Sequence, residues 1–170
     1  EGLGATLPAS RTQKGDEWTV EVTPNDGTAE GSSVSLSITI DNSAPSLTGA
    51  SINDTAPTES SELHCIAQGW SDADGDLEMT STEWFVSGSS VSTSDVLTGT
   101  DFSKGDDVYC VLTPSDDTDT GASVTSDTVT VQNAAPAIDS ITLSSTSPTR
   151  SDVISASATS ADVDGDTITY

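Results

Sequence analysis

The chain has 170 residues, of which 28 are Asp or Glu and 4 are Lys or Arg, so its formal net charge at pH 7 is -24. Such a charge excludes nucleic acid as a partner, because phosphate binding needs a basic face, and it disfavours an anionic membrane surface. Hydrophobic residues make up 32% of the chain and form no run of membrane-spanning length, so we expect no membrane insertion in this segment.

Short motifs recur along the chain at a spacing of about 90 residues. The Lys-Gly-Asp of residues 14–16 returns at residues 104–106, and the acidic stretch at residues 72–76 returns at residues 162–166. A period of this length fits a small β-sandwich domain and not a helical or leucine-rich repeat.

The repeat divides the chain into one complete unit and two partial ones. Because the start of the chain is out of phase with the repeat, the first partial unit is the second half of a domain. The third unit is correspondingly the first half of one. The predicted limits are residues 1–43, residues 44–134 and residues 135–170.

Apolar residues alternate with polar ones in every unit, which predicts short β-strands and no helix. In the complete unit a first strand is expected over residues 46–53. The later strands there are marked by Leu63, Cys65 and Ala67; by Trp84 and Val86; by Val96 and Leu97; by Val108, Cys110 and Leu112; and by Val129 and Val131. The partial units show the same pattern at Trp18, Val20 and Val22, at Val34, Leu36, Ile38 and Ile40, and at Ile154, Ala156 and Ala158.

The last strand of the complete unit breaks the alternation. Val124 and Val129 are five positions apart, so they cannot share a face of a regular strand, in which side chains alternate with a period of two. The equivalent residues of the first unit keep one parity. One inserted residue is a β-bulge, which we expect between Val124 and Val129.

Cys65, Trp84 and Cys110 follow one another on three of the predicted strands. In this order the chain resembles the immunoglobulin-like sandwich, in which a disulfide between strands packs on a buried Trp. The resemblance implies an all-β chain of tandem immunoglobulin-like β-sandwiches, one complete and two partial, in an extended array. One position departs from that family: Val108 stands two residues before the second Cys, and the neighbouring Tyr109 is expected to face outward.

The resemblance also implies a disulfide between Cys65 and Cys110 over Trp84. Internal comparison places both positions inward, because Cys110 aligns with Val20 and Cys65 aligns with Ala156, and both replacements suit a core. The alternative is a pair of buried thiols. A bridge would indicate an oxidising, extracellular location.

The acidic stretch at residues 72–76 has the sequence Asp-Ala-Asp-Gly-Asp, with carboxylates at alternate positions. These carboxylates repel one another unless a cation lies between them, and a hard divalent cation with several oxygen ligands, calcium above all, is the natural partner. The alternative is a solvated acidic turn. An EF-hand is not expected, because Leu77 stands at the loop position that requires Gly.

In a sandwich of this type, three loops meet at the end where the chain enters. Here they are residues 72–76, residues 115–119 and the incoming residues 41–43, all rich in oxygen atoms. They resemble the calcium-stiffened joints of cadherin-like and PKD-like surface repeats. The calcium ligands that this resemblance implies are Asp72, Asp74 and Asp76 with help from Asp116 or Asp41, and in the third unit Asp162, Asp164 and Asp166.

No nucleophile–base pair, His-based metal set or phosphate loop is visible, so we expect no enzyme. His64 is expected to be an exposed strand residue, and residues 53–55 form an Asn-glycosylation sequon, so glycans are possible partners. The leading hypothesis is a structural segment of a long extracellular repeat protein, such as an adhesin, stalk, sheath or filament. The alternative is a spacer or carbohydrate-binding module of a secreted hydrolase.

Each partial unit, taken alone, would expose an apolar sheet face and open strand edges, which invite pairing. We therefore expect these faces to be completed by further repeats of the same chain or by neighbouring copies along a filament. Folding of residues 1–43 against residues 135–170 of the same chain is not expected.

Overall fold

The structure is a computed structural model that describes residues 6–170, and these residues form an all-β chain. One short 3-10 turn, η1 (Ala9–Arg11), precedes the strands, and the alternation pattern did not predict it. The strands are β1 (Glu17–Val22), β2 (Val34–Thr39), β3 (Gly49–Ile52), β4 (Glu62–Gln68), β5 (Ser81–Val86), β6 (Ser89–Ser92), β7 (Val96–Thr98), β8 (Asp107–Thr113), β9 (Val124–Thr125), β10 (Val129–Thr130), β11 (Ala137–Leu143) and β12 (Ala156–Ala161).

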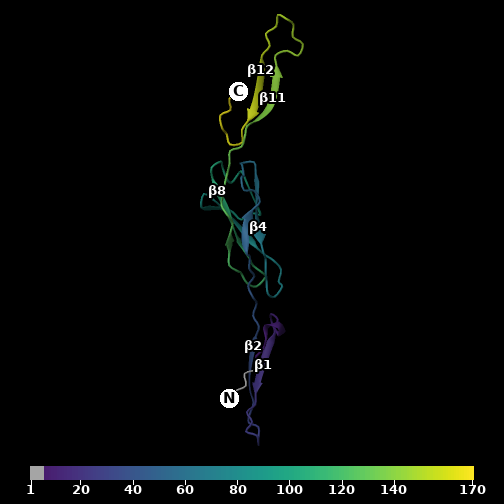
Figure 1. The fold of residues 1–170 in the computed structure, drawn as a ribbon, viewed down its shortest axis with the longest axis vertical. Helices are drawn as coiled ribbons and strands as arrows, with labels where there is room; N and C mark the ends of the chain where they lie inside the picture. The colour runs from purple at the N-terminus through teal and green to yellow at the C-terminus, as the bar shows by residue number, and fades with distance from the viewer. Residues whose placement is uncertain (1–5) are drawn as a thin grey trace.

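Two sheets in the middle of the chain share one hydrophobic core (Figure 1). One sheet has the strand order β3-β4-β7, and the other has the order β10-β8-β5-β6 with β9 also paired to β8. The core draws on both sheets and contains Leu63, Trp84, Val86, Leu97, Phe102, Val108, Cys110, Val129 and Val131. The alternation predicted most of these residues, but Ala67, which was expected to face inward with Leu63 and Cys65, is exposed near the end of β4.

Strand β8 shows the alternation most clearly. Val108, Cys110 and Leu112 are buried, whereas the residues between them are partly exposed. Tyr109 faces away from the core, as predicted, and its ring stacks on Phe85 of the neighbouring strand at a centroid distance of 4.9 Å. His64 of β4 is exposed, because its neighbour Leu63 takes the inner face.

A disulfide joins Cys65 of β4 to Cys110 of β8 and so links the two sheets. Cys110 lies directly opposite Trp84 in the pairing of β5 with β8, and both side chains are fully buried. The indole nitrogen of Trp84 donates a hydrogen bond to the carbonyl oxygen of Ser94 at 3.0 Å, so its polar atom is satisfied in the core. The predicted bridge and the predicted burial of Trp84 are confirmed.

The predicted bulge lies between β9 and β10. Thr125 pairs with Val111, and Ser126 hydrogen-bonds to Cys110, which continues the same register. Val129 then pairs with Val108, so the last strand contains one residue more than its partner. The extra residue returns the valine side chain to the core face.

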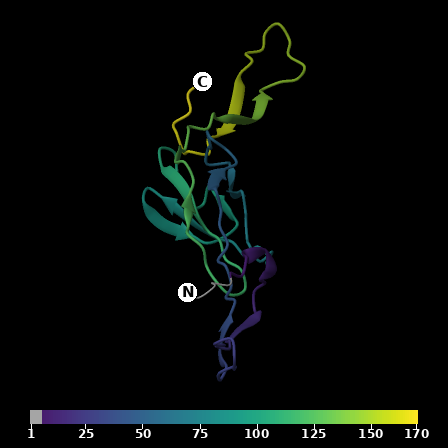
Figure 2. The same cartoon turned by 60° about the horizontal axis from the view of Figure 1, so that its bottom comes forward.

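Two isolated hairpins extend from opposite ends of the central sheets, and they do not touch each other (Figures 1 and 2). Hairpin β1–β2 lies within residues 1–43, and hairpin β11–β12 lies within residues 135–170. Their pairing repeats that of the central strands: Leu143 faces Ala156 as Ile52 faces Cys65. Each exposes an apolar face, with Leu36 67% and Ile141 66% exposed.

In the described residues no helix is long and apolar enough to cross a membrane.

Candidate metal-binding joints

The acidic loop at residues 72–76 is folded around one aspartate. Oδ1 of Asp72 accepts hydrogen bonds from the backbone N–H groups of Asp74 and Asp76 at 2.8 and 3.1 Å. Gly75 has φ +78, a left-handed conformation that lets the chain turn within this short loop. The turn holds the carboxylates of the loop close together.

Asp116 joins these carboxylates from the loop at residues 115–119. It is only 6% exposed, and its Oδ1 accepts the backbone N–H groups of Thr118 and Asp119 at 2.6 Å each. Carboxylate oxygens of Asp72, Asp76 and Asp116 lie within 4.8 Å of one another, which is close enough to hold a single metal ion. We call this set of side chains the first cluster.

The incoming linker binds both loops. The side-chain amide of Asn42 donates to Asp116 Oδ2 at 3.0 Å and to Asp119 Oδ2 at 2.8 Å. The backbone N–H of Ser43 donates to Asp74 Oδ2 at 2.7 Å. The hydrogen bond from Asn42, followed by those from the loop backbone, lowers the pKa of Asp116 below its ordinary value of 3.8, so this buried side chain stays ionised.

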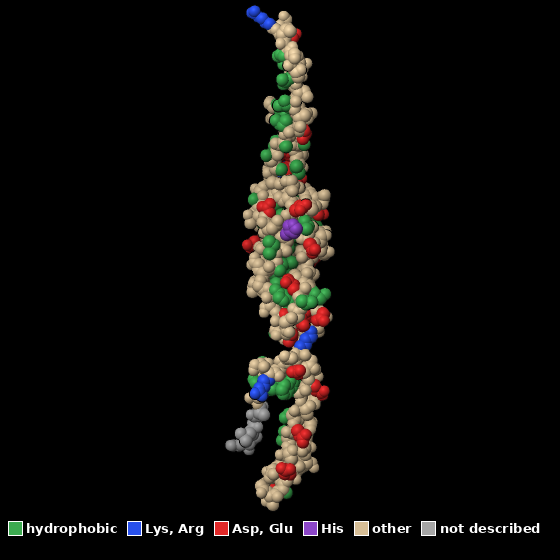
Figure 3. Space-filling view, turned by 90° about the vertical axis from the view of Figure 1, so that its right-hand side faces the viewer, with side chains coloured by type: hydrophobic (Ala, Val, Ile, Leu, Met, Phe, Trp, Pro, Cys, Tyr) green, Lys and Arg blue, Asp and Glu red, His purple; other side chains and the backbone are tan. Residues whose placement is uncertain are grey.

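Lys14, in the turn that precedes β1, completes this joint. Lys14 Nζ lies 2.9 Å from Asp76 Oδ2 and 3.6 Å from a carboxylate oxygen of Asp117, and it donates to the hydroxyl of Thr118 at 3.1 Å. The hydrogen bond to Asp76 and the nearby carboxylates raise the pKa of Lys14. Figure 3 shows a basic side chain among acidic ones where the hairpin meets the central sheets. The recurring Lys-Gly-Asp motif was the sequence signal for this contact.

The second joint repeats the lysine and linker contacts 90 or 91 residues later. Lys104 Nζ lies 2.5 Å from Asp166 Oδ2, and the backbone N–H of Ala134 donates to Asp164 Oδ2 at 2.6 Å. Oδ1 of Asp162 accepts the N–H groups of Asp164 and Asp166. The hydrogen bond to Asp166 raises the pKa of Lys104 as well. Oxygens of Asp162, Asp164 and Asp166 lie within 4.8 Å of one another and form the second cluster.

Each joint also contains a buried oxygen atom that has no hydrogen-bond partner among residues 6–170. These atoms are Oδ2 of Asp72 and Oδ1 of Asn42 in the first joint, and Oδ1 of Asp164 in the second. A buried carboxylate oxygen without a partner is costly, and a bound cation would offset that cost. The donor atoms are carboxylate and amide oxygens, which are the ligands that calcium prefers. The residues present therefore fit a calcium ion.

Not every predicted ligand belongs to a cluster. Asp74 uses Oδ2 to bind the linker and lies outside the first cluster, although its counterpart Asp164 lies inside the second. Asp41 is exposed and belongs to neither cluster in the described part of the chain. The linker instead contributes Asn42, the next residue.

Protein-family models, curated proteins and solved structures give no match to this chain. The geometry of the two joints therefore provides the basis for assigning a function.

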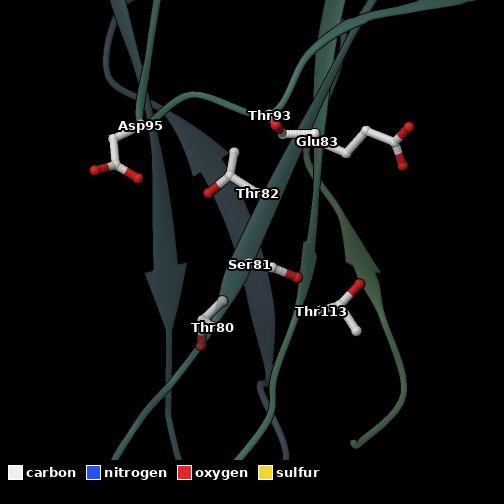
Figure 4. A pocket seen from close by; sticks show the side chains of 7 residues that line it. All are labelled: Thr80, Ser81, Thr82, Glu83, Thr93, Asp95 and Thr113. Carbon is white, nitrogen blue, oxygen red and sulfur yellow. The ribbon is translucent and has the colours of Figure 1, made fainter.

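A groove beside β5 could also hold a ligand (Figure 4). It is lined by hydroxyl-bearing side chains and by Glu83 and Asp95. The two carboxylates point away from each other across the groove, and its lining contains no aromatic ring on which a sugar could stack. The groove thus favours neither a paired-carboxylate hydrolase nor a carbohydrate-binding module.

Proposed function

We propose that the chain is a structural segment of a long extracellular repeat protein, such as an adhesin, stalk, sheath or filament. Its units are tandem immunoglobulin-like β-sandwiches, one complete and two partial, arranged in an extended array. Calcium ions stiffen the joints between the units, as the resemblance to cadherin-like and PKD-like surface repeats implies. In this proposal the segment supplies length and spacing and is not an enzyme.

One observation carries the proposal: the same joint occurs twice. Ser43 and Ala134 donate equivalent backbone hydrogen bonds to Asp74 and Asp164. Acidic loops on a lone domain need no such partners, because they could remain solvated. Two joints with the same linker contact, each beside a cluster of three carboxylates, indicate that the loops serve the connection between units.

Calcium fits these joints better than the smaller or softer metals. The ligand atoms are carboxylate oxygens on turns, which adapt to the large and irregular coordination sphere of calcium. Zinc favours nitrogen and sulfur ligands, and neither cluster contains His or Cys. Asp72, Asp76 and Asp116 would hold the first ion, and Asp162, Asp164 and Asp166 the second. Each ion would supply the positive charge that the clustered carboxylates need.

Two further features support an extracellular filament. The disulfide is typical of proteins in oxidising compartments. The apolar faces of the two hairpins require covering strands, which further repeats of the same protein, or neighbouring copies of it, would supply in the way that the central sheets cover each other. Both kinds of partner extend the array along its long axis.

Isothermal titration calorimetry with calcium chloride tests the calcium sites. The chain should bind one ion at each cluster, Asp72→Asn should abolish the first site and Asp162→Asn the second. The matched control is Asp95→Asn, which removes an exposed carboxylate outside both clusters and should leave both sites intact. Absence of calcium binding, or an equal loss in the control, would refute the sites.

A further inference from the structure

Both lysines of the chain occupy the same place in the repeat. Only four basic residues accompany 28 acidic ones, and the two lysines among them are Lys14 and Lys104. Each donates to the last aspartate of the acidic loop in the following unit, Asp76 or Asp166, and each pair is separated by 62 residues. A highly acidic chain thus places its scarce amino groups at its two joints.

The lysine is anchored to the strand that leads into the linker. In the first joint, the N–H of Gly15 donates to the carbonyl oxygen of Ile40, and the N–H of Ile40 donates to the carbonyl oxygen of Asp16. Ile40 is followed directly by residues 41–43, which bind the loops of the next unit. The lysine and the linker therefore reach the acidic loops as one rigid piece.

The second joint has the same anchor. Gly105 donates to the carbonyl oxygen of Val131, and Val131 donates back to Asp106. Lys104 Nζ also donates to Oδ1 of Asn133 in the linker at 3.1 Å, which ties the amino group to the linker itself. The arrangement is thus a property of the repeat and not of a single loop.

We propose that this lysine is the built-in counter-ion of the joint, which keeps successive units aligned when no metal is bound and weakens calcium binding by its charge. The proposal rests on the calcium sites proposed above and adds a second cation to each. Lysine and calcium share one carboxylate: Asp76 accepts from Lys14 and also belongs to the first cluster. Asp166 has the same double role in the second joint.

The ion pair between Lys14 and Asp76 affects the orientation of successive units more than the stability of either unit. Lys14 and Asp76 are each about one-third exposed, at 31% and 27% of their side chains, and such ion pairs add little to the stability of a domain. Across a joint, however, a fixed charge pair limits the angles that the linker allows. The amino group of Lys14 and the proposed calcium ion would both contact the carboxylate of Asp76, so the two positive charges repel each other.

The test compares two doubly substituted forms of the full chain that have the same net charge. Lys14→Met with Lys104→Met removes both lysines, and Arg11→Met with Arg150→Met removes both arginines, which form no ion pair among the described residues. Small-angle X-ray scattering is recorded in chelator, and calcium affinity is measured by calorimetry. Lys14→Arg with Lys104→Arg is the conservative variant and should retain the alignment.

In chelator, the lysine-to-methionine form should have a smaller maximum dimension and a broader distribution of shapes than the wild type, whereas the arginine form should not change. With calcium, the lysine-to-methionine form should bind roughly tenfold more tightly, the factor expected when a unit charge near a divalent ion is removed in a water-like dielectric. Unchanged scattering of that form, an equal change in the arginine form, or unchanged or weaker calcium affinity would overturn the proposal. If no form bound calcium, the proposed calcium sites would fail, and scattering in chelator alone would decide whether the lysine aligns the units.

Discussion

Removing the disulfide should cost the central sheets a large part of their stability. The bridge closes a loop with a sequence separation of 45 residues, for which the chain-entropy relation gives about 4 kcal/mol. Domains of this size are stable by only about 5–15 kcal/mol. Alanine is the suitable replacement at both positions, because Cys110 is fully buried beside Trp84 and a serine hydroxyl would lack a partner there.

The assay is urea unfolding of Cys65→Ala/Cys110→Ala, monitored by near-ultraviolet circular dichroism, which reports on the packing of aromatic side chains, including the buried Trp84. The free energy of unfolding should fall by about 4 kcal/mol relative to the oxidised wild type. Alkylation of the unfolded wild type without reductant should label neither cysteine. Labelling of both cysteines, or a loss of stability below about 1 kcal/mol, would refute the reasoning.

Three further predictions concern the core, one turn and the linker. Leu63→Ala should lower the free energy of unfolding by about 2–5 kcal/mol, because Leu63 is 0% exposed. Leu77→Ala, at a position that is 85% exposed, should change it by less than about 0.5 kcal/mol. Equal losses in urea unfolding would contradict the core assignment. Hydrogen bonds from the backbone N–H groups of Ala29 and Thr28 hold the pKa of Asp26 below 3.8 in the folded chain. The stability that they contribute should therefore be complete above pH 3.8 and be lost as the pH falls through the lower folded pKa. An NMR titration that gave a pKa of 3.8 or more for Asp26 would be inconsistent with these hydrogen bonds. Asn42→Ala should raise the pKa of Asp116 toward its ordinary value in the same kind of titration, and an unchanged value would show that Asn42 does not stabilise the carboxylate.

The sequence predicted the central core well, because alternation reports directly which side chains share a face. Val108, Cys110 and Leu112 needed no further information to be placed inward. The bulge was predictable for a related reason: an odd spacing between Val124 and Val129 conflicts with a regular strand, and the ladder resolves that conflict with one extra residue.

The residues that contact one another at each joint were harder to predict. The sequence indicated which loops meet, but the choice among Asp41, Asn42 and Ser43 depends on the exact path of the linker, which alternation does not determine. Lys14 was recognised as part of a repeated motif without a role, because its partner Asp76 is 62 residues away in the next unit. Only the relative placement of two units brings these residues together.

The most direct test of calcium-stiffened joints is small-angle X-ray scattering combined with thermal unfolding, performed on the same chain with calcium and with chelator. Calcium at a hundredfold excess over its dissociation constant should stabilise the folded chain by about 2.7 kcal/mol for each site and raise the melting temperature. It should also narrow the distribution of inter-unit angles and increase the maximum dimension. Identical scattering profiles and identical melting temperatures in the two conditions would contradict the account.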